Sequence, residues 1–490
     1  MKLSPTDWAS AHSADAWREL QETQLRRYIR NILYPHSPYY RRLFDENKIN
    51  PARIQSIADL RSIPFTSKKD LLPTPDKPTK YRDFILTPDQ KELKRKPSVI
   101  FRALLDGRDT VQRELEREFR PIFLTATTGR SSDPVAFTYT HHDLNNLLDC
   151  GNRLIQTFGN NTSDRGINIF PFAPHLAFWQ VAFAGIEFGM MLVHTGGGKA
   201  LGTPAIIAMI DKIKPQSLQG MPTYLYHLLH EGLAQKKRWD HITSLVLGGE
   251  AVPAGMRRKL IQLLEQMGAG DVHIIGTYGF TEAKYAWPEC PAPADSPSGF
   301  HLYPDKEVIE IINPDTGEPV SDEQEGEIVY SSIDGRGSVV FRYRTGDYTE
   351  GGVTWKPCPH CGRRCPRLLG PIGRRSNIKD LQINKLKGTL VNFNDLEHIL
   401  DDDAQVAEWQ LEIRKQNDDP LEVDELVVHL CPTERTDVEP LKARVAEKFQ
   451  QTTELRPSRI EIHSFDEMRK RLGLDTALKQ IRILDSRPKS

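Results

Sequence analysis

The chain has 490 residues, which is long enough for two or more domains with sizeable hydrophobic cores. Its 65 lysines and arginines almost balance its 66 aspartates and glutamates, so the overall charge favours neither nucleic acid nor an anionic membrane as a partner. No apolar run reaches the length of a membrane span, no signal peptide is evident, and six cysteines are too few for a disulfide scaffold. We therefore expect a cytoplasmic protein that binds neither nucleic acid nor membrane. The sequence does not determine its oligomeric state, and a homodimer is one option.

The first 120 residues are predicted to be mainly helical. Apolar residues recur at helical spacing from Trp17 to Tyr34, and Pro35 should end that helix. Within IPFTSKKDLL, a Ser or Thr cap is expected in front of another helix. Residues 75–120 are rich in charge and are best interpreted as a solvated connection, with a helix from Thr110 to Glu118.

A loop rich in threonine and glycine follows at residues 123–139, FLTATTGRSSDPVAFTY. Small hydroxyl residues and glycine let a backbone wrap round an anion, and Arg130 adds a positive charge. A plain surface turn explains the same residues about as well. The loop is not a Walker motif, because no G-K-[ST] ends it.

Apolar segments then alternate with helical ones. Strands are expected at residues 167–170, 190–194, 245–247 and 272–275, with helices such as Pro204–Ile213 and Ala254–Met267 between them. This alternation is typical of a mostly parallel sheet with helices on its faces.

The later part of the chain changes character. VIEII and GEIVY flank a Pro/Gly turn and predict an antiparallel pair, and a β-β-α-β pattern follows Arg374. We predict an α/β fold in two domains. Residues 1–373 would form a large domain of mostly parallel sheets plus a small β region, and residues 374–490 a small mobile α+β lid.

Two short motifs lie at the ends of predicted strands, and a third lies further along the chain. In LVLGGEAVP, the pair Gly248-Gly249 would let a flat ring approach the backbone. In TYGFTE, Tyr278 offers a face for stacking a base and Glu282 an oxygen ligand for Mg²⁺, although a helix N-cap is the simpler explanation. In FRYRTGD, Asp347 could accept both hydroxyls of a ribose.

Taken together, these motifs resemble the adenylate-forming ligases, most closely the phenylacetate–CoA ligase branch. The resemblance also covers YYRRLFDENKI, IPFTSKKDLL, TATTG, the Gly373-Arg374 hinge and KGTLVNFNDLEHIL, in family order and with family-like spacing. Each motif is weak by itself, and the combination is specific.

The resemblance implies a role for each matching residue. Those implied to bind the nucleotide are Thr125, Thr127, Thr128 and Gly129 (phosphates), Gly249, Glu250, Thr277, Tyr278 and Gly279 (adenine side), and Asp347 and Arg374 (ribose). Those implied to be catalytic are Lys479, Thr281 at the α-phosphate, and Glu282 as the Mg²⁺ ligand. Read without its neighbours, Lys479 would be an ordinary surface lysine.

The chain departs from the family pattern in two places. Ala126 stands where the phosphate loop usually has glycine, and Arg375, Ser376 and Asn377 replace the acidic residues that usually follow the hinge. We expect nucleotide binding to survive these changes, whereas the switching of the lid is in doubt.

The acid is expected to bind near FPFAPHLAFW and GMPTYLY. Phe172, His175, Phe178 and Tyr224 could line a cavity that accepts an aromatic acid, although ordinary core packing explains each of them as well. TGGGKA, residues 195–200, resembles a phosphate loop but is interpreted as a turn.

Three of the six cysteines lie close together. Cys358 and Cys361 have the C-x-x-C spacing of a zinc knuckle, a redox pair or chance. Relatives in the resembling branch look similar here, with a Cys, a Gly-aromatic-His and a Cys pair in this order. We therefore predict a structural zinc site from Cys290, His301, Cys358 and Cys361, with Cys365 as the rival fourth ligand.

The predicted function is an ATP-dependent acid–thiol ligase. It would activate an aromatic or cyclic carboxylic acid as acyl-AMP and transfer the acyl group to coenzyme A, using ATP, Mg²⁺ and structural Zn²⁺. An amide ligase using an amine or amino acid, or a loader of a carrier protein, remains open. A zinc-knuckle nucleic-acid-binding protein is a distant alternative, disfavoured by the balanced charge.

Overall fold

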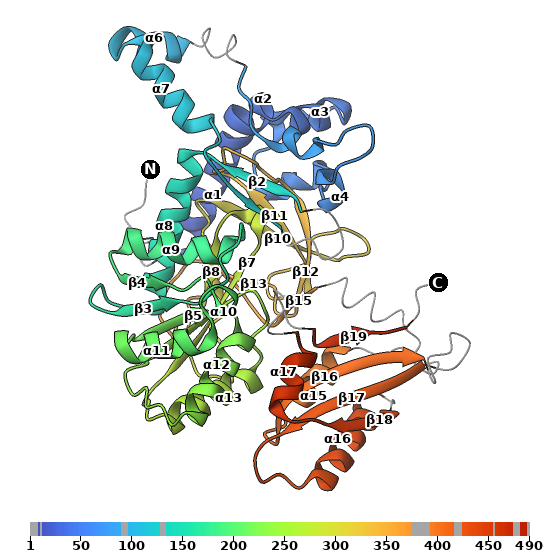
Figure 1. Cartoon of the computed structure of the whole chain (residues 1–490). Coiled ribbons are helices and arrows are strands. Elements are labelled where there is room, and N and C mark those ends of the chain that lie inside the picture. The colour runs from blue at the N-terminus through green and yellow to red at the C-terminus, as the bar shows by residue number, and fades with distance from the viewer. Residues whose placement is uncertain are drawn as a thin grey trace.

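Figure 1 shows the computed structural model of the chain. It describes residues 8–9, 12–89, 97–127, 134–374, 393–415, 424–453, 456–473 and 481–487. Within those ranges, no helix is both long and apolar enough to cross a lipid bilayer.

Short helices build the N-terminal part. The predicted first helix is α1 (Ala14–Tyr28), which starts at the cap Ser13 and continues through a π-turn, η1 (Ile29–Leu33), into α2 (Tyr34–His36). The expectation that Pro35 ends the helix is therefore wrong by about one residue. The π-turn in front of Pro35 shifts the hydrogen-bond pattern, so that the missing N–H of proline is accommodated.

The next helices follow the expected cap. Ser67 and Asp70 form a capping box in front of a short helix, which confirms the predicted cap in IPFTSKKDLL. The elements of this region are α3 (Pro38–Glu46), η2 (Pro51–Arg53), η3 (Ile57–Ser62), α4 (Lys68–Leu71) and η4 (Lys80–Phe84).

A helical hairpin replaces the single solvated helix predicted for residues 75–120. It consists of α6 (Pro97–Leu105) and α7 (Arg108–Phe119), and it projects away from the remaining elements in Figure 1. The sequence analysis missed α6, because its apolar side chains suggest a buried segment, whereas Phe101 and Leu104 are exposed.

A six-stranded sheet forms the centre of the large N-terminal part, with the strand order β4-β3-β5-β6-β7-β8. Its first five strands in that order pair in parallel, which confirms the predicted parallel sheet, and β8 pairs antiparallel with β7. The strands are β3 (Arg165–Asn168), β4 (Met191–His194), β5 (Ser217–Gly220), β6 (Ser244–Leu247), β7 (His273–Gly279) and β8 (Ala286–Pro288).

Helices cover both faces of this sheet. Leu245 and Leu247 of β6 pack in one apolar cluster with α11, α12 and α13, whereas Val246 between them packs in another with α8 and α9. This follows from the alternation of side chains along a strand. The helices are α8 (His141–Phe158), α9 (Leu176–Phe188), α10 (Gly198–Leu201), α11 (Thr203–Ile213), α12 (Pro222–Ala234) and α13 (Ala254–Gln266).

Smaller antiparallel sheets lie beside the central one. The predicted VIEII–GEIVY pair is confirmed as β10 and β11, which belong to a four-stranded sheet of order β10-β11-β12-β15. The strands outside the central sheet are β1 (Phe123–Ala126), β2 (Ala136–Tyr139), β9 (Phe300–His301), β10 (Glu307–Ile312), β11 (Gly326–Ser332), β12 (Tyr343–Thr349), β13 (Val353–Thr354), β14 (Arg367–Leu368) and β15 (Ile372–Arg374).

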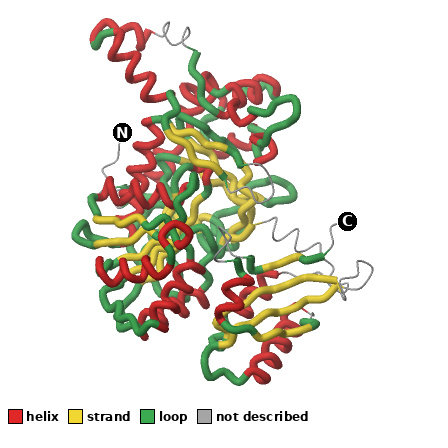
Figure 2. Tube along the Cα trace, viewed as in Figure 1, coloured by secondary structure: helices red, strands yellow, loops and turns green. Residues whose placement is uncertain are grey.

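The C-terminal part has a sheet and an apolar core of its own, and it forms the lower right of the molecule in Figure 2. The predicted β-β-α-β order is confirmed, and the sheet order is β18-β17-β16-β19. The elements are α15 (Phe393–Asp401), β16 (Val406–Lys415), β17 (Asp424–Pro432), α16 (Val438–Thr453), β18 (Arg459–Ile462), α17 (Phe465–Arg471) and β19 (Ile483–Asp485). The domain boundary at Arg374 stays a prediction.

Candidate active site

Eight of the predicted site residues lie at or just after the carboxyl ends of the parallel strands. The segments in question follow β3 (residues 170–175), β4 (195–200), β5 (221–224) and β6 (248–250), or lie at the end of β7 (277–279). Because parallel strands present their carboxyl ends at one edge of the sheet, these segments meet there, where open α/β sheets bind ligands.

The loop after β6 lies tightly against the end of β7. A Cβ atom at Gly248 would clash with Oγ1 of Thr277, and that hydroxyl donates to the carbonyl of Leu247 at 2.9 Å. Gly249 has a φ of +82°, which favours glycine. The Glu250 carboxylate accepts a hydrogen bond from Oγ1 of Thr223 at 2.8 Å. The loop is thus fixed to the end of β7 through Thr277 and to the start of α12 through Thr223.

Tyr278 joins the central sheet to the second sheet. Its hydroxyl donates to Asp347 on β12 at 2.7 Å, and Asp347 stands opposite Arg374 in the β12–β15 register. The Tyr278 ring also stacks on Trp287, with centroids 5.6 Å apart at 25°. The residues predicted for adenine and ribose therefore lie next to one another.

Glu282 lies close to this contact. Its Oε1 accepts from the hydroxyl of Tyr343 at 2.9 Å, and Thr281 and Glu282 form the short helix η5 (Thr281–Ala283) just after β7. The sequence analysis assigned no role to Tyr343 or Thr223, although both lie inside or beside motifs it singled out. Only their contacts across the sheet edge distinguish them from their neighbours.

The phosphate loop is described in part. Thr125 is fully buried on β1 and pairs with the hydroxyl of Tyr139 at 3.2 Å, whereas Oγ1 of Thr127 accepts from the N–H of Val135 at 3.0 Å. Thr128 and Gly129 lie outside the described residues, as does Lys479. The side chain of Arg374 is likewise outside the description.

The predicted acyl-binding residues gather round the TGGGKA segment. Phe172 packs edge-on against Phe178 at 5.2 Å, and its N–H donates to the carbonyl of Gly196 at 3.0 Å. A Cβ atom at Gly198 would meet the ring of Tyr224, so that ring packs directly on this segment. TGGGKA runs from the end of β4 into α10, so its last three residues are helical instead of part of a turn. The segment also brings together two residues of the predicted acid site.

His175 connects that region to the phosphate loop. Its Nδ1 lies 3.2 Å from the carbonyl oxygen of Ala126, at the end of β1. Phe172 is 64% exposed, so one side of the region is open to solvent.

A buried ion pair supports the segment after β7. Nζ of Lys284 lies 2.8 Å from Oδ1 of Asp143, and both side chains are buried. Burial opposes charge on Asp143, but Lys284 and backbone N–H donors outweigh it and hold the pKa of this carboxyl below its usual value. Neither residue was singled out in the sequence, because the two are 141 positions apart.

Comparisons with known proteins agree with this geometry. The profile described as AMP-binding enzyme matches residues 66–337, more than half of the chain. The chain belongs to the AMP-binding enzyme family. The predicted resemblance to adenylate-forming ligases of the phenylacetate–CoA ligase branch is confirmed.

Two relatives of this AMP-binding enzyme are phenylacetate–coenzyme A ligases. That of Thermus thermophilus is 26% identical over 74% of this chain and 71% of its own length. That of Aromatoleum evansii is 27% identical over 78% of this chain and 77% of its own length.

The solved structures confirm the fold. A 2-hydroxyisobutyryl-CoA ligase in its postadenylation state, in complex with R3-HIB-AMP, has a TM-score of 0.74 at 18% identity and covers 99% of this chain and 94% of its own. The same ligase in its thioesterification state has a TM-score of 0.60.

The predicted zinc ligands of the AMP-binding enzyme lie together. The ligand atoms of Cys290, His301, Cys358 and Cys361 all lie within 4.8 Å of one another. The Cys290 and Cys358 sulfurs are 3.7 Å apart, and Sγ of Cys361 is 3.3 Å from Nε2 of His301. A tetrahedral zinc ion with sulfur ligands at about 2.3 Å places two of them about 3.8 Å apart, so the geometry fits.

The second contact of His301 fits as well. Its Nδ1 lies 3.1 Å from the carbonyl oxygen of Pro288, which leaves Nε2 facing the cysteines, as in metal-binding histidines. Cys365 is fully buried and belongs to the hydrophobic core, outside the group of four.

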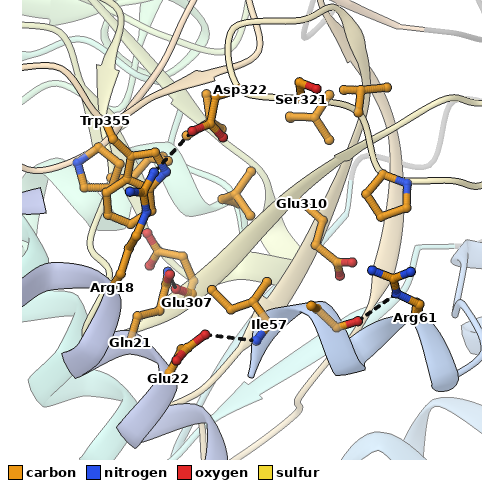
Figure 3. Close-up of a pocket in the computed structure, with 18 residues that line it drawn as sticks. Arg18, Gln21, Glu22, Ile57, Arg61, Glu307, Glu310, Ser321, Asp322 and Trp355 are labelled. Atoms are coloured by element: carbon orange, nitrogen blue, oxygen red, sulfur yellow. Dashed lines mark hydrogen bonds and ion pairs between the residues drawn. The ribbon is translucent and has the colours of Figure 1, made fainter. Parts of the chain in front are cut away.

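A cavity of about 390 Å³, lined by both charged and apolar side chains, lies elsewhere, between α1, η3 and β10 (Figure 3). Glu310 points into it and pairs with Arg342 at 3.4 Å, while Arg18 and Asp322 form an ion pair at its edge. None of the predicted nucleotide or acid residues lines this cavity.

Proposed function

We propose that this AMP-binding enzyme is an ATP-dependent ligase that activates a carboxylic acid as acyl-AMP and transfers the acyl group to coenzyme A. The single observation that carries the proposal is the contact of Tyr278 with Asp347, beside Glu282, at the edge where strand ends meet. The matched curated relatives are named phenylacetate–coenzyme A ligases, which favours phenylacetate or a similar aromatic acid and coenzyme A.

The reaction has two steps. A carboxylate oxygen attacks the α-phosphorus of ATP, a bond to this phosphorus forms, and the bond to the β-phosphate oxygen breaks as pyrophosphate leaves. The thiolate of coenzyme A then attacks the acyl carbon, and AMP leaves with the electron pair of the broken carbon–oxygen bond. The enzyme contributes mainly positioning and stabilisation of charge.

The nucleotide roles follow from the site. The adenine would be bordered by Gly249, Glu250 and Tyr278. The ribose hydroxyls would donate hydrogen bonds to Asp347 and accept them from Arg374. Of the two described threonines of the phosphate loop, Thr127 is the less buried and the better placed for a phosphate, because the Thr125 hydroxyl faces Tyr139. Mg²⁺ bound with ATP would neutralise phosphate charge, with Glu282 as its protein ligand.

The acid would lie against the TGGGKA segment. Phe172, Phe178 and Tyr224 supply aromatic surface there, and His175 lies between this surface and the phosphate loop. An aromatic acid would thus have its ring on the apolar side and its carboxylate towards the α-phosphate.

The lid and its lysine complete the proposal. Residues 374–490 would move as a unit, and Lys479 would bridge the carboxylate and the α-phosphate during the first step. The described part of this unit has its own core, which supports such a movement.

We also propose a structural zinc ion bound by Cys290, His301, Cys358 and Cys361. Bound zinc would supply cross-linking between two loops and no catalytic chemistry, because four protein ligands leave no open position. All six cysteines are free, which fits a reducing compartment such as the cytoplasm.

The test is pyrophosphate release across a panel of carboxylic acids, with and without coenzyme A. We expect release with phenylacetate-like acids and an acyl-CoA product when coenzyme A is added. Amide formation with amino acids, without any thioester, would contradict the assignment of the acceptor.

A further inference from the structure

A second cluster of metal-binding side chains lies in the C-terminal sheet. His429 on β17 and Glu461 on β18 are direct neighbours in the register of these parallel strands, and His463 follows two residues after Glu461. Residues two apart on a strand point to the same face, so all three side chains are on one face.

The ligand atoms of the three side chains lie close together. His429 Nδ1 is 2.9 Å from His463 Nε2 and 3.4 Å from Glu461 Oε2, and the last two atoms are 3.8 Å apart. A triangle with these sides has a centre about 2.0 Å from each corner, which is the length of a zinc–nitrogen or zinc–oxygen bond. One ion could therefore contact all three atoms without moving them.

The other ring nitrogen of His429 is held as in metal-binding histidines. Its Nε2 lies 2.9 Å from Oε2 of Glu412 on the neighbouring strand β16. Nη2 of Arg471, which can only donate, also lies 2.8 Å from this Nε2. Metal binding at Nδ1 requires the tautomer with the proton on Nε2; that proton is donated to Glu412, and the Nδ1 lone pair is then directed at the cluster.

The surroundings of Glu412 include one cation. Nη2 of Arg471 is 3.1 Å from Glu412 Oε2 and 2.8 Å from His429 Nε2, so both nitrogens lie beside the same carboxylate. Oε1 of Glu412 accepts from the hydroxyl of Ser486 at 2.9 Å. Glu412 thus offsets the guanidinium charge next to the cluster.

We propose that His429, Glu461 and His463 bind a divalent transition-metal ion, separate from the four-ligand cysteine cluster. Two imidazoles and a carboxylate suit zinc, cobalt or nickel. The side chains of Glu461 and His463 are 39% and 17% exposed, so an ion can enter from solvent, and water can fill the remaining positions.

The position of the site suggests its effect on the C-terminal part. The ion would join β17 to β18, and Glu412 extends the network to Arg471 and Ser486. These two residues flank, in sequence, the segment that carries Lys479. We therefore expect metal binding to stabilise the positions of Arg471 and Ser486, the described residues on either side of that segment.

The test uses the full chain, in which the cysteine cluster has been filled with one equivalent of zinc and loosely bound metal removed. Calorimetric titration with Zn²⁺ should show one further site in the wild type. Glu412→Gln should weaken it by about 10–100-fold, as expected when the partner of a ligating histidine is changed. His463→Gln should abolish it, and His398→Gln, at an exposed histidine of α15, should leave it unchanged.

Two further measurements keep the result decisive. Glu461→Gln alters a partly exposed side chain, so it should lose the ion even if His463→Gln disturbs folding. Co²⁺ added in place of the second zinc should show no sulfur-to-cobalt charge-transfer band. Wild-type protein without a second site, unchanged binding in Glu461→Gln, or a thiolate spectrum would each overturn the proposal.

Discussion

Glu307 is a carboxyl inside the hydrophobic core. Burial raises its pKa to about 8, although Tyr285, Trp287 and the N–H of Tyr303 all donate to it. The sequence VIEII predicts a strand, and β10 confirms it. Glu307 stands directly before VIEII and is the first residue of β10. The strand pattern does not reveal that Glu307 points into the core, because that depends on which residues lie opposite.

A pH-dependent stability follows from Glu307. The folded pKa exceeds the unfolded value of 4.5, so the folded state holds more protons between these values and stability falls as pH rises from about 4.5 to about 8. Glu307→Gln should remove this loss, worth at most about 5 kcal/mol at about 1.36 kcal/mol per pKa unit. Thermal unfolding measures this: the unfolding temperature of Glu307→Gln, relative to that of the wild type, should be higher at pH 8.5 than at pH 5.5. A constant difference, or an equal gain in the exposed control Glu325→Gln, would contradict this account.

Gly248 allows the nucleotide loop to approach β7. A Cβ atom there would clash with Oγ1 of Thr277, so Gly248→Ala should cost about 1–3 kcal/mol of stability and raise KM for ATP. Thr277→Ala in the same chain should recover part of both losses. Gly270→Ala, where nothing lies within 4 Å of the added atom, is the matched control. Purely additive effects in the double mutant would show that the close contact is not the cause.

At the scale of elements, a buried ion pair joins α13 to one edge of the central sheet. Arg257 on α13 contacts Glu289 through Nη2 at 2.8 and 3.0 Å and donates to the carbonyl of Ile274 on β7. Glu289 in turn accepts from the N–H of Gly276 at 2.6 Å and directly precedes Cys290, one of the proposed zinc ligands. The pair therefore fixes β7, α13 and the loop that begins at Cys290 to one another.

Breaking this pair should be costly. Arg257→Met leaves Glu289 buried without its partner, and the expected loss is about 3–5 kcal/mol in the free energy of unfolding. Arg238→Met removes the exposed contact with Asp240 and should cost less than about 1 kcal/mol. Urea unfolding of both variants measures the difference, and similar losses would contradict the assigned role of burial.

The zinc proposal belongs to the same scale, because the four ligands come from two loops. Cys358→Ser should lower tightly bound zinc from about one ion per chain towards zero and lower the unfolding temperature, since metal binding and local folding are coupled. Cys431→Ser, in the C-terminal core, should leave the zinc content unchanged. Chelated protein that stays fully stable would contradict the site.

Elements with a clear period or turn were predictable from the sequence, and the others were not. β10 and β11 flank a Pro/Gly turn, and β16 and β17 alternate over a long stretch, so their pairing could be inferred. β5 was missed because SLQG is short and half polar, and its burial comes from the neighbouring strands β3 and β6. The motifs of the site were visible because glycine and threonine cluster in them.

At the scale of the whole molecule, the C-terminal part rests on the helices that follow β5 and β6. The ring of Phe465 stacks on His230 of α12 at 4.1 Å, and Arg258 of α13 pairs with Asp402 at 3.0 Å. α12 begins at Pro222, inside the site segment 221–224, and α13 begins at Ala254, shortly after the site segment 248–250. The sequence could not predict this arrangement, because it depends on a few contacts between surfaces that are distant along the chain.

The account as a whole requires that ATP is split to AMP and pyrophosphate only when an acid is present. The most direct measurement is analysis of all products with ATP, phenylacetate and coenzyme A, for the wild type and for Asp347→Asn. We expect AMP, pyrophosphate and phenylacetyl-CoA in equal amounts, with KM for ATP raised about tenfold or more in Asp347→Asn, because the ribose loses a charged acceptor. Formation of ADP and phosphate, or AMP without any thioester across a panel of acids, would contradict the proposed function.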